Sequence, residues 1–226
     1  MIEIKNIFKS FGLSKVLNDI SAKFERGKTN LIIGQSGSGK TVLLKCLLGL
    51  YSIDQGELIY DNIYSSKMND EEKTNIKKEM GMVFQGSALF DSMTVLENVR
   101  FPLDMLTKYS DKEKNQIALK FIDRVNLNDA INKLPSEISG GMQKRVGIAR
   151  AIVLNPKYLF CDEPNSGLDP KTAIVIDNLI QEITKEYNIT TVINSHDMNS
   201  VIEICLLYTS DAADDSLRVD LGGRRI

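Results

Sequence analysis

The sequence of 226 residues has 42% hydrophobic residues, 26% charged residues and a formal net charge of −2 at pH 7. This balance is typical of a globular domain, excludes a disordered or collagen-like chain, and lacks the basic excess expected of a nucleic-acid-binding protein. Apolar segments are short or broken by charges, so none is expected to span a bilayer, and the N-terminus lacks a signal-peptide core. Three widely spaced cysteines without metal-ligand spacing indicate reduced thiols in a cytosolic protein, with Cys46 and Cys161 buried.

The first third of the chain predicts strands around one glycine-rich loop. Alternating apolar residues within 1–33 indicate short strands, the first at an edge. The segment 29–34 (TNLIIG) predicts a buried strand that leads through the loop into an apolar helix, which is the beginning of a parallel α/β unit. Short strands at 56–64, a polar helix at about 70–79 and a strand at 80–85 follow.

The middle of the chain, about 86–155, predicts a helical lobe inserted into the α/β unit. Thr94 with Glu97, and Ser110 with Glu113, have the spacing of capping boxes, in which each partner of the pair satisfies a free backbone N–H at the start of a helix.

The last third returns to strands and helices in alternation. The segments 158–164 (YLFCDEP) and 189–196 (ITTVINSH) predict buried strands, and an amphipathic helix begins at Asp169-Pro170. Strands that alternate with helices predict a parallel sheet covered on both faces.

The glycine-rich loop GQSGSGKT matches the pattern G-x-x-x-x-G-K-[ST] in full. Its backbone N–H groups and the following helix N-terminus are expected to hold the phosphates of a nucleoside triphosphate. Lys40 is expected to reach the β- and γ-phosphates, and the Thr41 hydroxyl to bind Mg²⁺. A flexible turn is the alternative, which the flanking strand and helix disfavour. The loop comprises Gly34, Gln35, Ser36, Gly37, Ser38, Gly39, Lys40 and Thr41.

Polar residues at the ends of three predicted strands are candidates for the chemistry. The carboxyl ends of parallel strands face the ligand crevice, so Asp162 is expected to bind Mg²⁺ and Glu163 to orient or deprotonate a water molecule. His196, the single histidine, is a candidate γ-phosphate contact or a structural residue. Gln85 is a candidate contact to Mg²⁺ or water, or simply a polar strand end.

A second glycine-rich helix start lies at Ser139-Gly140-Gly141-Met142-Gln143. Two phosphate-binding helix ends in one chain are explained if the second serves the nucleotide of another subunit, so that a symmetric dimer encloses two nucleotides. A plain glycine-rich N-cap is the alternative.

Phe11, GQSGSGKT, Gln85, ISGGMQ, YLFCDEP, NSGLDP and His196 together resemble the ATP-binding cassette family, from about residue 1 to 204. The resemblance implies an α/β P-loop NTPase (RecA-like) with a parallel-sheet core, an N-terminal antiparallel β subdomain and an inserted α-helical subdomain. It implies an ATPase that binds ATP and Mg²⁺, with Phe11 stacked on adenine. Residues 139–143 would contact the ATP of the partner in a homodimer, and residues 166–169 would cross the dimer interface. Met142 and Asn165 depart from the usual pattern.

A narrower likeness lies in the segment MGMVFQGSALFDSMTVLENVRFPL, which looks like the ATPases of Mce/Mla-type phospholipid transport systems. It implies a place on the inner face of the cell membrane, an integral membrane permease and an Mce-type substrate-binding protein as partners. Alternatives are transport of a lipoprotein, metal or amino acid, a non-transport ATPase of this family, or a non-catalytic nucleotide-gated module. The permease is expected to dock on 86–93, through Gly86, Ala88, Leu89, Phe90 and Met93; packing of Leu89 and Phe90 within the helical lobe is the alternative.

Residues 205–226 look like translated sequencing adapter rather than native sequence. They are therefore set apart from the nucleotide-binding domain at 1–204, and Cys205 with them; a genuine variant terminus is the alternative. Because closing strands would then be missing, the chain as written is expected to fold poorly.

Overall fold

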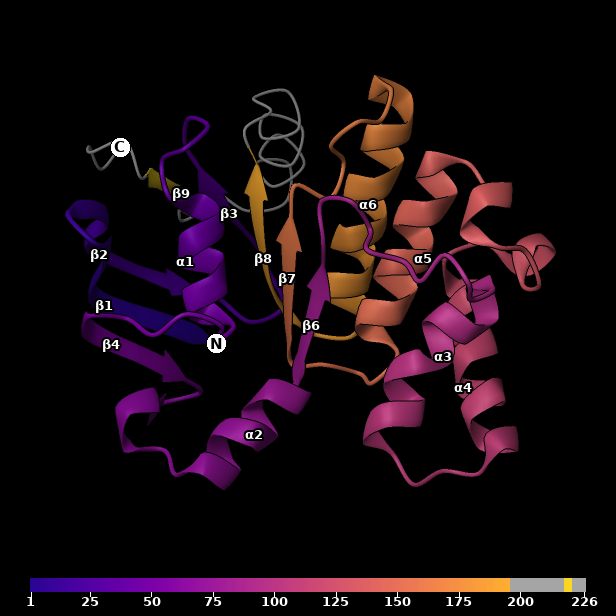
Figure 1. Ribbon diagram of the computed structural model, residues 1–226, viewed down its shortest axis with the longest axis horizontal. Helices are drawn as coiled ribbons and strands as arrows, with labels where there is room; N and C mark the ends of the chain where they lie inside the picture. The colour runs from indigo at the N-terminus through magenta and orange to yellow at the C-terminus, as the bar shows by residue number, and fades with distance from the viewer. Residues whose placement is uncertain (196–217, 221–226) are drawn as a thin grey trace.

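A five-stranded parallel sheet forms the centre of the molecule in the computed structural model, which describes residues 1–195 and 218–220 (Figure 1). The strands run in the order β6-β7-β8-β3-β9, and each pair of neighbours is parallel. Both faces of the sheet are covered at β7 and β8, so nearly all their side chains are buried, including the polar ones of β8. The bounds are β3 (Thr29–Ile33), β6 (Met80–Val83), β7 (Tyr158–Asp162), β8 (Thr190–Ser195) and β9 (Arg218–Asp220).

A second, antiparallel sheet lies beside the first at the N-terminal end of the chain (Figure 1). Its strand order is β2-β1-β4-β5, and the outer strands pair in antiparallel register with their neighbours. The bounds are β1 (Ile2–Phe11), β2 (Ser14–Phe24), β4 (Gln55–Tyr60) and β5 (Ile63–Tyr64). The predicted combination of a parallel core and an antiparallel β subdomain is confirmed.

The parallel sheet separates two hydrophobic cores. Alternate residues of a strand point to opposite faces, so Leu159 and Cys161 of β7 join the core with the helical lobe and α6, whereas Phe160 joins the core with α1 and the antiparallel sheet. The helices outside the lobe are α1 (Lys40–Leu47), α2 (Asp70–Lys78), α6 (Pro170–Glu186) and the short 3₁₀ helix η1 (Ser65–Lys67).

The helical lobe occupies the other end of the molecule (Figure 1). It contains α3 (Val95–Leu106), α4 (Asp111–Arg124), α5 (Gly140–Ile152) and the 3₁₀ helices η2 (Asn128–Ala130) and η3 (Pro135–Glu137). Both predicted capping boxes are confirmed: the N3 backbone N–H donates to the Thr94 side chain in α3 and to the Ser110 side chain in α4, and each N3 glutamate accepts from the cap backbone.

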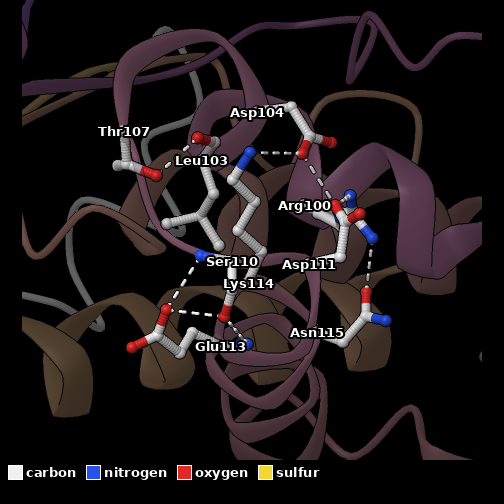
Figure 2. Close-up of polar contacts among 9 residues, drawn as sticks. All are labelled: Arg100, Leu103, Asp104, Thr107, Ser110, Asp111, Glu113, Lys114 and Asn115. Atoms are coloured by element: carbon white, nitrogen blue, oxygen red, sulfur yellow. Dashed lines mark hydrogen bonds and ion pairs between the residues drawn. The ribbon is translucent and has the colours of Figure 1, made fainter.

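A polar network fixes the turn between α3 and α4 (Figure 2). The Arg100 guanidinium donates to Asp104 at 3.0 Å and to Asn115 at 2.8 Å, and it also pairs with Asp111. Lys114 reaches Asp104 at 3.2 Å, so charges of both helices meet at one place. This network joins the two helices in addition to the apolar core beneath them.

The strand that leads to Gln85 is shorter than predicted. The strand expected at 80–85 ends at Val83, so Gln85 lies two residues beyond the strand rather than at its end. His196 and most of the predicted non-native tail lie outside the described residues, and the assignment of the tail stays a prediction; three of its residues form β9 beside β3. Among the described residues, none of the helices has the length and apolar character needed to cross a membrane.

Candidate functional site

The loop between β3 and α1 is folded around the side chain of its own lysine. Lys40 is buried, and its ammonium donates to the carbonyl oxygens of Gly34 at 2.7 Å and Gln35 at 3.0 Å. Gly39 has φ of +95° and precedes α1 directly, and a Cβ there would lie 3.0 Å from a methyl carbon of Val16. The left-handed conformation therefore favours glycine at this position, and the close neighbours leave little room for a Cβ.

The same loop contains a buried hydroxyl that no described residue satisfies. The Oγ atom of Ser38 is buried without a hydrogen-bond partner among the described residues, although Ser38 lies only one residue before the N-cap of α1. A buried hydroxyl without a partner costs stability, and phosphate oxygens at a helix N-terminus would satisfy it. The loop therefore fits the phosphate tail of a nucleotide.

A hydroxyl and a carboxylate meet next to this loop. The Oγ1 atom of Thr41, in the first turn of α1, donates to Oδ1 of Asp162 at the end of β7 over 3.3 Å. Such hard oxygen donors suit Mg²⁺, which also keeps water and phosphate oxygens as ligands. The described residues hold no cluster of three His, Cys, Asp or Glu side chains suited to a metal. A magnesium ion held by Thr41 and Asp162 would take phosphate oxygens and water as its further ligands.

The carboxylate of Glu163 lies against the amide of Gln85. The Nε2 atom of Gln85 donates to Oε2 of Glu163 at 2.8 Å and approaches the Ser166 hydroxyl at 3.4 Å. The backbone of Glu163 is left-handed, with φ of +47°, a conformation that is costly for a residue with a Cβ. The structure thus brings Gln85 to the candidate catalytic acid, with a backbone that turns sharply after Asp162.

Two further residues at this site were missed in the sequence. Asn194 of β8 contacts Asp162, Glu163 and Thr41. Lys144 of α5 is buried and donates to the backbone oxygen of Gln85. Burial lowers the pKa of the Lys144 ammonium, although the nearby Glu163 carboxylate acts in the opposite direction. Asn194 lies in the segment ITTVINS, which also contains threonine and serine, so its polar side chain did not stand out in the sequence; nothing in the sequence marked Lys144 either.

The second glycine segment forms a helix start packed on the loop before α6. The Ser139 hydroxyl accepts from the backbone N–H of Met142 at 3.3 Å and so caps α5. A Cβ on Gly141 would lie 2.6 Å from a methyl carbon of Thr172, so glycine is also needed for packing. The Gln143 amide donates to the Pro135 carbonyl at 2.9 Å, within the same subunit. A role of residues 139–143 toward a partner's nucleotide stays a prediction.

The remaining predicted contacts lie at the surface. Phe11 is exposed and meets the ring of Tyr51 edge-on, with centroids 5.4 Å apart. In the proposed docking segment, Leu89 packs against the lobe core, whereas Phe90 is 39% exposed and lies 4.6 Å from the Phe101 ring. Leu89 thus packs within the helical lobe, as the alternative stated, and permease docking on residues 86–93 stays a prediction.

Comparisons with known proteins show which family the chain resembles. A family model described as "ABC transporter" matches residues 17–166. The chain is 38% identical over 205 residues to the methionine import ATP-binding protein MetN of Clostridioides difficile (strain 630), covering 91% of this chain and 64% of that protein. It is 38% identical over 198 residues to the "Probable ribonucleotide transport ATP-binding protein mkl" of Mycobacterium leprae (strain TN), covering 88% and 57%. The chain therefore spans less than two thirds of the length of these relatives.

Among solved structures, the ATP-binding cassette MJ0796 is 33% identical, with a TM-score of 0.78 over 88% of this chain and 90% of that chain. That protein was solved as a dimer in a post-hydrolysis state with ADP and Pi bound. The family model, the relatives and this structure together show that the chain belongs to the ABC transporter family.

Proposed function

We propose that this chain is the ATP-hydrolysing subunit of a membrane transporter and that it works as a homodimer on the inner face of the cell membrane. The observation that carries the proposal is the convergence of Thr41, Asp162, Glu163 and Gln85 beside the phosphate loop. The dimer of MJ0796 with ADP and Pi supports the same use of the fold.

Each residue of the site has a separate role in ATP hydrolysis. The loop amides, Lys40 and the Ser38 hydroxyl bind the phosphates. Thr41 and Asp162 would hold Mg²⁺, which would offset the phosphate charge. Glu163 orients the attacking water and accepts its proton, and Gln85 holds the Glu163 carboxylate in place. His196 contacts the γ-phosphate, and Phe11 stacks on adenine. Residues 139–143 close over the nucleotide of the partner subunit.

For the transported substrate, the sequence likeness around residues 80–103 favours phospholipid, with an Mce-type substrate-binding protein in the complex. The relatives named for methionine import and ribonucleotide transport provide the alternatives. Reconstitution with a candidate permease would distinguish them, because lipid mass spectrometry of the vesicles and uptake of labelled methionine or ribonucleotide report different cargoes. Methionine uptake without lipid transfer would contradict the phospholipid assignment.

The variant Glu163→Gln tests hydrolysis. It keeps the shape of the side chain and removes the base, so turnover should fall by about 100-fold or more while ATP still binds and the dimer accumulates. Phosphate release and size-exclusion chromatography with ATP measure the two effects. Glu182→Gln, an exposed carboxylate paired with Arg124, is the matched control and should keep full turnover. Normal turnover in Glu163→Gln would remove Glu163 from its proposed role.

A further inference from the structure

We propose that Asn194 is a positioning residue. It holds the proposed Mg²⁺ ligands, Thr41 and Asp162, and the proposed catalytic acid, Glu163, in fixed positions relative to one another. The inference rests on the proposed ATPase function and assigns a role to a side chain that touches neither water nor nucleotide in that mechanism. It derives from three contacts made by one buried amide group.

Asn194 occupies the position where the three elements of the site converge. In the sheet, β8 lies between β3, which precedes the phosphate loop, and β7, which ends in Asp162. Asn194 is the direct register partner of both Asp162 and Ile32. Its side chain is completely buried, so the amide requires partners within the protein.

The donor end of the amide faces the metal-binding pair. The Nδ2 atom donates to Oδ1 of Asp162 at 2.7 Å and lies 3.5 Å from the Oγ1 atom of Thr41. A hydrogen bond to one carboxylate oxygen fixes the rotation of the carboxylate and leaves the other oxygen for a metal. Residues that orient metal ligands in this way commonly account for about 10- to 100-fold in metal affinity.

The acceptor end of the amide faces Glu163. The backbone N–H of Glu163 donates to Oδ1 of Asn194 at 2.8 Å and also approaches the backbone oxygen of Asn194 at 3.2 Å. These bonds support the left-handed backbone of Glu163, a conformation that is otherwise unfavourable for a residue with a Cβ. One amide thus fixes the carboxylate of residue 162 and the backbone of residue 163.

A purely structural role would make Asn194 equivalent to other buried amides in the sheet. Asn30 of β3 provides that comparison, because it is buried and bonds the backbone of Glu25, Lys28 and Thr191, away from the phosphate loop. Asn194→Leu and Asn30→Leu both replace an amide by an apolar group of similar size. Only the first should alter the site.

The decisive measurement is metal affinity without turnover. In the Glu163→Gln background, binding of Mn²⁺ to the ATP complex is followed by electron paramagnetic resonance, and ATP affinity is measured separately in EDTA. Asn194→Leu should weaken Mn²⁺ binding by about 10-fold or more and leave metal-free ATP affinity within about twofold. Asn30→Leu should leave both unchanged, even if it lowers thermal stability.

The ATPase assay separates this inference from the proposed function. With Glu163 intact, Asn194→Leu should lower kcat by about 10-fold or more and raise the Mg²⁺ concentration needed for half-maximal rate. Asn194→Ala removes the same contacts and serves if the leucine variant does not fold. Unchanged Mn²⁺ affinity, or an equal loss in Asn30→Leu, would overturn the role of Asn194. If the wild-type chain bound Mn²⁺ with ATP but hydrolysed nothing, the proposed ATPase function would fail. The difference in Mn²⁺ affinity between Asn194→Leu and Asn30→Leu would still decide whether Asn194 positions the metal ligands.

Discussion

At the scale of single residues, the substitution Ser38→Ala should raise the stability of the nucleotide-free chain but weaken ATP binding. The buried Oγ atom of Ser38 has no partner among the described residues, so Ser38→Ala should stabilise the nucleotide-free chain by about 1 kcal/mol. The same change removes a hydrogen bond to phosphate and should weaken ATP binding about 10-fold. Thermal melting and calorimetry measure the two effects. Ser36→Ala, at an exposed position of the same loop, should leave the melting temperature unchanged. ATP affinity unaltered by Ser38→Ala would contradict the proposed phosphate contact.

The placement of the two candidate acids at the end of β7 was predictable from the sequence, whereas the contacts of Asn194 were not. Asp162 and Glu163 follow an apolar run and stand close in sequence to the strand end that positions them. The role of Asn194 depends on β8 lying between β3 and β7, a strand order that no local pattern specifies. Likewise, Lys144 meets Gln85 from a helix 59 residues further along the chain. Contacts of this kind arise only when the topology is known.

At the scale of elements, α5 holds the segment that follows Gln85. Arg150 donates to the carbonyl oxygens of Ser87 at 2.7 Å and Ala88 at 2.8 Å. Both residues have positive φ, +59° and +46°, so this part of the chain has an unfavourable backbone that the guanidinium helps to stabilise. Lys144 adds a contact to Gln85 from the same helix. We therefore expect α5 and residues 85–90 to move together when the lobe moves.

Arg150→Met tests this attachment. Methionine retains much of the apolar stem but loses two hydrogen bonds from a charged donor, which should lower the local stability of residues 84–93 by about 2 kcal/mol. Amide hydrogen exchange in that segment should accelerate by about 30-fold. Arg145→Met is the matched control, because Arg145 lies on the same helix and bonds the carbonyl oxygens of Val125 and Asn126. Equal protection of residues 84–93 in both variants would show that α5 does not hold the segment.

The elements themselves were largely predictable because their signals are local. The capping boxes at Thr94 and Ser110 lie where their sequence spacing placed them, and the helix after the phosphate loop begins at Lys40. The strand that ends at Val83 was predicted too long, since apolar Phe84 continues the pattern although it lies beyond the last residue paired with β7. The positive φ values of Ser87 and Ala88 had no glycine to reveal them.

At the scale of the whole molecule, the two cores share one sheet, which should make them open together. Strands β3, β7 and β8 each contribute residues to both cores, so loss of the sheet exposes both faces. Cys46 lies in the core with α1, and Cys161 lies in the core with the helical lobe; both are fully buried. Burial raises the pKa of the Cys46 thiol to about 11 and also raises the pKa of Cys161. Each thiol is therefore a protected probe of its own side of the sheet.

Thiol labelling tests whether the cores open together. In two variants, Cys161→Ser and Cys46→Ser, each with Cys205→Ser, one described cysteine remains, and iodoacetamide labelling is followed at pH 8 over a range of urea concentrations. Because the thiolate reacts and burial disfavours it, labelling should require opening of the surrounding core. The labelling rate of each thiol, normalised to that of the unfolded variant, gives the free energy of opening around that thiol. After the unfolding free energy of the same variant is subtracted, the values for Cys46 and Cys161 should agree within about 0.5 kcal/mol. ATP should slow both equally, since a ligand of the native state stabilises it against global opening. Faster labelling of Cys161 at low urea, insensitive to ATP, would instead show that the helical lobe opens while the nucleotide-binding half of the sheet stays folded.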